Sequence, residues 1–159
     1  MKKYVFNLTL LLFMASCGST VNNAEENEIN DKEQEKSSLV YSINTNLKIG
    51  SSDKWTDGYY QIECDSIGQV TVYSHTANQS QKYLHYFFNI KEVSFGAESI
   101  NEKSWISVTS RKESKRPIKE WFPPKGQGSD SSWQIMMRVE PLTLARKTRS
   151  LLFDLSKLY

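Results

Sequence analysis

The stretch QVTVYSH, residues 69 to 75, decides the fold class of this chain of 159 residues. Its apolar and polar residues alternate, so in a strand Val70 and Val72 share one face while Thr71 and Tyr73 share the other. An antiparallel sheet with one buried face produces this alternation. We therefore expect the folded part of the chain to be built mainly from β-strands.

Five further segments alternate in the same way, at residues 38–43, 59–64, 82–89, 104–110 and 133–140. Turn-forming residues separate many of these segments, at positions 57–58, 65–68, 77–80 and 126–130. Short strands joined by such turns are typical of antiparallel pairing. The sequence therefore predicts a mainly-β fold, either an antiparallel sandwich or an open barrel.

The C-terminal segment allows two interpretations. As a helix it gathers one apolar stripe, and as a strand it alternates Leu151, Phe153 and Leu155 on one face. Phe153 distinguishes the two, because it falls on the polar face of the helix but on the apolar face of the strand. The stripe slightly favours a helix, which would make the fold α+β with one C-terminal helix. Its members are Leu144, Ala145, Thr148, Leu151, Leu152, Leu155 and Leu158.

The first 16 residues have the three parts of a secretory signal peptide. Lys2 and Lys3 come first, an apolar run follows from Tyr4 to Met14, and the small residues Ala15 and Ser16 close the segment. A helix needs about 20 apolar residues to cross the hydrocarbon core of a bilayer. The run is shorter than that, so we expect residues 1–16 to be removed and not to remain as a membrane span.

The motif Met14-Ala15-Ser16-Cys17-Gly18 resembles the lipobox of bacterial lipoproteins. The resemblance covers residues 1–18 and implies that cleavage occurs before Cys17, whose sulfur receives a diacylglyceryl group and whose amino group is acylated, for example with palmitate. Two or more acyl chains hold a protein firmly on a bilayer. The resemblance implies a lipid-anchored protein of the bacterial cell envelope, at the outer membrane or the periplasmic face. The alternative is a plain secreted protein whose Cys17 forms a disulfide.

Residues 17–37 are expected to form the lipidated cysteine and a disordered acidic linker. Between residues 18 and 37 there are six acidic residues and two lysines, and Val21 and Ile29 are the sizeable aliphatic residues. Such a composition cannot bury enough apolar surface to offset the entropy lost on ordering. Residues 38–159 hold all four tryptophans and are long enough for a single folded domain.

No sequence pattern identifies catalytic chemistry or a metal site. His75 and His85 lie in predicted strands without a Cys or carboxylate at the spacing of metal ligands. The nucleophile-elbow, zinc-protease and P-loop motifs are missing from the sequence. A lipidated Cys17 leaves Cys64 as a lone thiol, which we expect to be buried and inert. We predict no catalytic residue, no metal and no cofactor, although a pocket holding either histidine beside a carboxylate would favour an enzyme.

The most unusual stretch is RKESKRPIKEWFPPKGQGSD, residues 111–130. Six basic and two acidic residues lie between positions 111 and 125, together with an aromatic pair and two prolines. Exposed Trp, Arg and Lys are typical of protein-binding hot spots and of polyanion sites. The alternative is a solvated loop whose aromatic residues fold back onto the core. The candidate binding residues are Arg111, Lys112, Lys115, Arg116, Lys119, Trp121, Phe122 and Lys125.

The mature chain, without Lys2 and Lys3, has no formal net charge, so its overall charge does not favour nucleic acid as a partner. We expect a membrane-anchored envelope lipoprotein that acts as a non-enzymatic protein-interaction domain, of the immunity or the envelope-assembly type. The richness in aromatic residues keeps a glycan or cell-wall polymer binding module as the alternative. A hydrolytic enzyme is the third interpretation.

Overall fold

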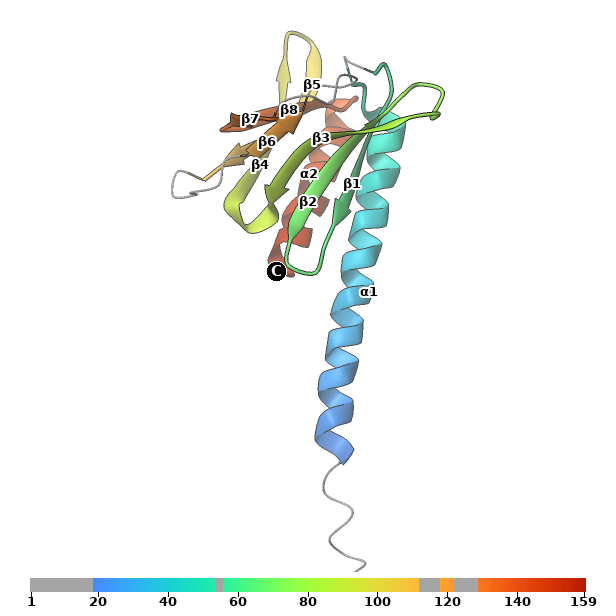
Figure 1. The fold of residues 1–159 in the computed structure, drawn as a ribbon, viewed down its shortest axis with the longest axis vertical. Helices are drawn as coiled ribbons and strands as arrows, with labels where there is room; N and C mark the ends of the chain where they lie inside the picture. The colour runs from blue at the N-terminus through green and yellow to red at the C-terminus, as the bar shows by residue number, and fades with distance from the viewer. Residues whose placement is uncertain (1–18, 54–55, 112–117, 122–128) are drawn as a thin grey trace, which may run out of the picture. The chain divides into compact units, whose positions relative to one another are not determined.

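The computed structural model describes residues 19–53, 56–111, 118–121 and 129–159 (Figure 1). Within these residues the chain forms two antiparallel sheets and two α-helices, the second of them C-terminal. The predicted mainly-β fold with a C-terminal helix is therefore confirmed. The chain divides into two units, Met1–Glu35 and Lys36–Tyr159, and each is described by itself.

The strands of both sheets lie in Lys36–Tyr159. The five-stranded sheet has the order β1 (Tyr60–Cys64), β2 (Gln69–His75), β3 (Lys82–Asn89), β6 (Ile118–Trp121) and β7 (Ser129–Ser132). The three-stranded sheet has the order β4 (Val93–Ile100), β5 (Lys103–Ser110) and β8 (Gln134–Arg138). A short 3-10 helix, η1 (Ile90–Glu92), leads from β3 into β4. The outer strands are thus β1 and β7 in the wider sheet, and β4 and β8 in the narrower one.

Helix α1 (Ser19–Gly50) stands where the sequence predicted a disordered linker followed by a strand. Within the unit Met1–Glu35, the residues from Ser19 onward form a helix. This corrects the expectation that they are disordered. Glu, Gln and Lys favour helices, and Glu28 and Lys32 form an ion pair one turn apart, at 2.8 Å. The side chains of residues 27–35 are all exposed, as their polar composition predicts.

The strand predicted at residues 38–43 is wrong, because these residues belong to the last turns of α1. Ile43 and Leu47, four residues apart, are fully buried, and Leu39 packs against the same core. This spacing puts all three side chains on one helix face. The apolar residues Leu39 and Ile43, which the sequence assigned to one face of a strand, lie on one face of a helix instead.

Helix α2 (Leu142–Lys157) follows the helical interpretation of the C-terminal segment. Ala145, Leu152 and Leu155 are buried, whereas Phe153 remains 45% exposed on the opposite face. Placing Phe153 outside leaves a continuous apolar stripe to cover the sheet residues. The helix contacts β4 and β5 of the three-stranded sheet.

Helix side chains cover two of the sheet edges. At the edge of β1, Asn44 of α1 accepts a hydrogen bond from the Ile62 N–H, at 2.7 Å, and donates to the Ile62 carbonyl, at 3.0 Å. Figure 1 shows the C-terminal half of α1 running beside β1. At the edge of β4, Arg149 of α2 donates to the Phe95 carbonyl, at 3.0 Å. These contacts occupy backbone groups that an edge strand otherwise leaves open.

The core lies between the sheets and the helices. Phe88 of β3 and Phe95 of β4 meet edge to face, with ring centroids 6.4 Å apart, and so join the two sheets. Aliphatic residues complete the core. Its fully buried members include Ile43, Leu47, Ile62, Val70, Val72, Ile90, Ile106, Ile118, Met137, Leu152 and Leu155.

Candidate functional site

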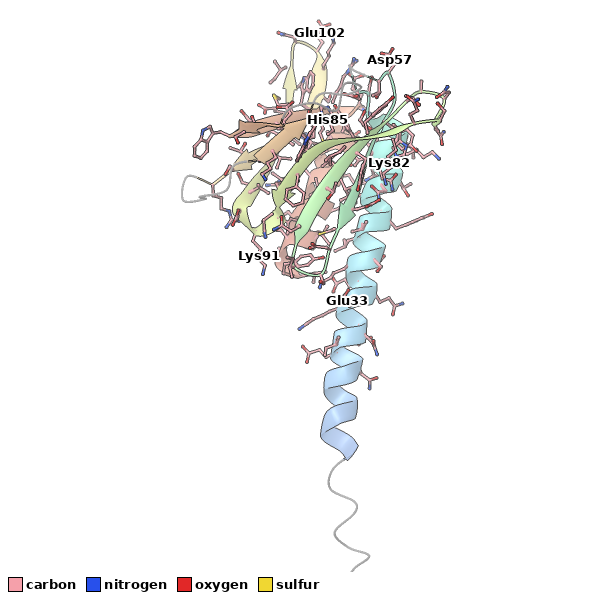
Figure 2. All side chains as sticks on the ribbon, viewed as in Figure 1. Glu33, Asp57, Lys82, His85, Lys91 and Glu102 are labelled. Atoms are coloured by element: carbon pink, nitrogen blue, oxygen red, sulfur yellow. The ribbon has the colours of Figure 1, made fainter. Side chains whose placement is uncertain are left out.

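A β-bulge turns His85 into the interior. In the pairing of β2 with β3, Val72 faces Tyr86 and Tyr73 faces Leu84, so His85 is an extra residue without a partner in the ladder. Strict alternation would put the neighbours His85 and Tyr86 on opposite faces, yet both are buried. Figure 2 shows His85 among the strands, inside the domain.

Asp53 lies beside His85 and is also fully buried. It follows α1 and accepts hydrogen bonds from Ser74 Oγ at 2.6 Å, from Thr56 N–H at 3.1 Å, and from Tyr60 Oη at 3.0 Å. The loop that carries Asp53 needs a glycine at Gly58, since a Cβ there would lie 1.7 Å from the carbonyl oxygen of His75. The cluster therefore ties this loop to β1, β2 and β3.

The two ring nitrogens of His85 have different surroundings. Nδ1 lies 2.9 Å from the Trp121 carbonyl, which can only accept, so Nδ1 must carry a proton. Nε2 lies 3.5 Å from Asp53 Oδ1, too far for a good hydrogen bond, and it has no hydrogen-bond partner among the described residues. Because the side chain of His85 is fully buried, neither ring nitrogen is accessible to a bound substrate.

Three groups of this cluster have shifted pKa values. Burial opposes ionisation of Asp53, but His85 and the Ser74 and Thr56 hydroxyls outweigh it and hold the Asp53 pKa well below its usual range. Burial, reinforced by the nearby Asp53 charge, raises the pKa values of Tyr60 and Tyr86. The cluster thus consists of one carboxylate that accepts hydrogen bonds from Thr56, Tyr60 and Ser74, with His85 beside it.

Asp53 also forms part of the wall of a pocket of about 450 Å³, a size within the range of pockets that bind small ligands. His85 is not among the lining residues, so the pocket does not expose the histidine. The walls combine aromatic, apolar and charged side chains from both sheets. They are Ser52, Asp53, Tyr60, Tyr86, Lys103, Trp105, Glu120, Gln134, Ile135, Met136 and Arg138.

The structure brings together few of the binding residues predicted from the sequence. Arg111 and Lys119 are exposed, and Trp121 is half-buried in β6. Lys112, Lys115, Arg116, Phe122 and Lys125 lie outside the described residues, as does Cys17. The segment 111–130 is not one long loop, because it contains β6 and the first residues of β7, paired in antiparallel fashion.

Trp133 is a candidate that the sequence analysis did not single out. It lies between β7 and β8 and is 62% exposed, more than Trp121. Its neighbours alternate as strand residues, so the pattern predicted a strand there but could not tell which face Trp133 takes. An exposed Trp is a typical anchor of protein interfaces.

His75 and Cys64 lie in ordinary structural settings. His75 stacks on Tyr59, with centroids 4.6 Å apart, and its Nε2 lies 2.7 Å from Gln61 Oε1. Burial and the charges of two nearby lysines lower the pKa of His75. Cys64 is half-buried in β1, where burial raises the pKa of its thiol, and it donates to Tyr159 Oη at 3.4 Å.

The described residues form neither a metal site nor a membrane-spanning helix. No three His, Cys, Asp or Glu side chains in the described ranges converge as metal ligands would. Neither of the described helices is long and apolar enough to span a membrane. No protein-family model, curated protein or solved structure matches this chain.

Proposed function

We propose that this chain is a lipid-anchored protein of the bacterial cell envelope whose folded domain binds a partner protein without catalysing a reaction. The observation that carries the proposal is Cys17, placed directly after an apolar run and two small residues. An acylated Cys17 would tether residues 18–159 to a bilayer, at the outer membrane or the periplasmic face. A domain tethered there can bind partner proteins that lie near the membrane surface, as an immunity protein or an envelope-assembly factor does.

The proposed binding surface is the basic stretch from Arg111 to Lys125. Its described members are accessible to a partner, since Arg111 and Lys119 are exposed and Trp121 keeps part of its ring outside the core. Arg and Trp supply much of the energy at interfaces, and lysines steer acidic partners toward them. The part of the chain that contains this stretch, residues 111–159, has eleven basic and five acidic residues.

The environment of His85 supports a binding role over an enzymatic one. A general base needs a nitrogen within hydrogen-bond reach of the substrate, whereas the two nitrogens of His85 face Trp121 and Asp53. The pair therefore reads as a structural element of the core. The hydrolytic enzyme stays the third interpretation.

Binding of a glycan or cell-wall polymer is the second candidate, because the pocket of about 450 Å³ combines three aromatic rings with polar groups. Sugars stack on aromatic faces and are held in place by a few polar side chains. Titration with soluble cell-wall oligosaccharides, followed by tryptophan fluorescence, tests it. A saturable shift that Trp105→Ala removes would favour this candidate over the first.

The anchor is tested by the intact mass of the chain purified from bacterial membranes. We expect a chain that begins at Cys17 and carries fatty acyl chains, and we expect Cys17→Ser to leave the membrane fraction. A native chain that begins upstream of Cys17, or that carries no lipid, would remove the basis of the proposal.

The binding surface is tested by charge reversal. Arg111→Glu combined with Lys119→Glu should abolish capture of a partner from envelope extracts, identified by mass spectrometry, without changing the melting temperature. Lys91→Glu is the matched control, because Lys91 is equally exposed but lies in η1, outside the basic stretch (Figure 2). Equal capture by the double variant and the control would rule out this surface.

A further inference from the structure

The outer edge of β8 presents backbone groups that point away from its sheet. Ser110 N–H donates to the Trp133 carbonyl, at 2.8 Å, at one end of the pairing with β5. Val139 N–H donates to the Ser104 carbonyl, at 3.0 Å, at the other end. Along an antiparallel ladder, every second residue bonds to the neighbouring strand. Trp133 and Val139 bond to β5, and Met136 lies three positions from each of them, so its N–H and C=O point away from β5.

Other groups cover both ends of this edge. Ser52 N–H donates to the Arg138 carbonyl, at 3.2 Å, and Ser132 Oγ donates to the Gln134 carbonyl, at 2.6 Å. Between these two contacts lie the N–H and C=O of Met136 and the N–H of Arg138. Within the described ranges, no residue forms a hydrogen bond with these three groups.

The pocket of about 450 Å³ runs along this open part of the edge, since Gln134, Met136 and Arg138 all line it. Tyr86 and Glu120, from the five-stranded sheet, also line it. The sheet that ends at β8 has three strands, two fewer than the sheet it faces. The pocket therefore lies where a further strand would continue the narrower sheet.

The edge of β1 shows which kind of group pairs with the outward backbone groups of an edge strand. At β1, the outward N–H and C=O of Ile62 bind the side-chain amide of Asn44, which offers one acceptor and one donor as a peptide group does. Met136 offers the same pair of groups in the same kind of position. A peptide backbone is the chemistry that matches them, and an extended strand repeats that match at Arg138.

We infer that β8 binds an extended segment of a partner protein, which adds a fourth strand to the three-stranded sheet. The segment accepts hydrogen bonds from the N–H groups of Met136 and Arg138 and donates one to the Met136 carbonyl. Trp105 and Met136 contribute half-buried apolar surface for one of its side chains. The inference shares with the proposed function the idea of a protein partner, but it rests on the backbone edge of β8 and not on the side chains of Arg111, Lys119 and Trp121.

The test begins with a displayed library of random heptapeptides, selected on the full chain purified in detergent. Selected peptides should bind Met136→Leu as well as the native chain, because this substitution keeps the backbone N–H. They should bind Met136→Pro at least tenfold more weakly, because proline removes that N–H while leaving the ladder to β5 intact. Equal binding to both variants, or a library that yields no binder, would overturn the inference.

Residue-resolved hydrogen exchange of the native chain tests the same point without a substitution. Addition of a selected peptide should slow exchange at the Met136 and Arg138 amides at least tenfold. Unchanged exchange there would overturn the inference, as would protection by chitooligosaccharides in place of peptides, or protection that rises with chain concentration alone, which would indicate a second copy. Binding that survives Arg111→Glu with Lys119→Glu separates this result from the proposed function.

Discussion

The edge strands β1 and β8 expose the same backbone chemistry but meet different surroundings. At β1, both outward groups of Ile62 are bonded to Asn44, a residue of α1 that packs beside the strand. At β8, the corresponding groups of Met136 face a pocket instead of a helix. An exposed strand edge invites pairing with other chains, so proteins usually cover it. We infer from this difference that the edge of β1 is closed for stability, whereas the edge of β8 stays open to bind a partner strand.

The largest expected effect contrasts two neighbours in β8. Ile135→Pro should destabilise the domain by about 5 kcal/mol, because it removes both a ladder hydrogen bond to β5 and a buried side chain. Met136→Pro should cost about 1 kcal/mol or less, since its N–H points outward. Chemical denaturation of both variants measures the difference. Similar losses would mean that the Met136 N–H takes part in the folded core.

Next in size is the removal of the Asp53 charge. Asp53→Asn should reduce the free energy of unfolding by about 3 kcal/mol, because it leaves His85 and the surrounding donors without their carboxylate. It should also loosen Ser52 and thereby lengthen the open edge of β8. Asp57→Asn, at an exposed position of the same loop, is the control. Thermal unfolding measures the first effect and hydrogen exchange at the Ser52 amide measures the second. An Asp53→Asn variant as stable as the native chain would contradict the prediction.

Opening the edge of β1 should have a smaller effect. Asn44→Ala leaves the N–H and C=O of Ile62 without their partner, which should cost about 2 kcal/mol and raise the tendency to associate. Thr45→Ala is the matched control on the exposed face of α1. Denaturation and light scattering report the two outcomes. If Asn44→Ala matches the control, Asn44 does not close this edge.

The smallest expected effect is a dependence on acid. Asp53 has a lowered pKa in the folded chain, so its contribution is complete at neutral pH and declines as pH falls below the pKa of about 3.9 of an unfolded Asp. We expect about 1 kcal/mol of this contribution to be lost by pH 3. The difference in stability between the native chain and Asp53→Asn should shrink by that amount. A difference that stays constant between pH 7 and pH 3 would rule out the charge as its cause.

Alternation in the sequence identified the strands with one buried face. β1, β2, β3 and β8 lie within predicted segments and β5 begins one residue before its segment, because most inward residues are apolar and most outward ones are polar. β4 was not predicted, because its alternation of apolar and polar residues is short and ends with Ser99 on the inward side and Ile100 on the outward side. β6 lies within the basic stretch and β7 follows it, and apart from the fully buried Ile118 few apolar residues mark either strand.

The buried cluster could not be read from the sequence. His85 was expected to lie in a strand, as it does, but its place beside Asp53 depends on a bulge that no residue pattern predicts. Asp53 belongs to a polar, turn-like stretch, and such residues are mostly exposed. The contacts that bury it come from Ser74 and Tyr60, distant in sequence or across a turn, so only the three-dimensional fold brings them together.

Hydrogen exchange of the free chain at the Ile62 and Met136 amides tests the central contrast most directly. Both amides point outward from edge strands, but the Ile62 N–H has Asn44 as its acceptor while the Met136 N–H faces the pocket. We predict that the Ile62 amide exchanges at least a hundredfold more slowly than the Met136 amide in the free chain. Equal protection of the two amides would show that the edge of β8 is already closed, and would contradict the account.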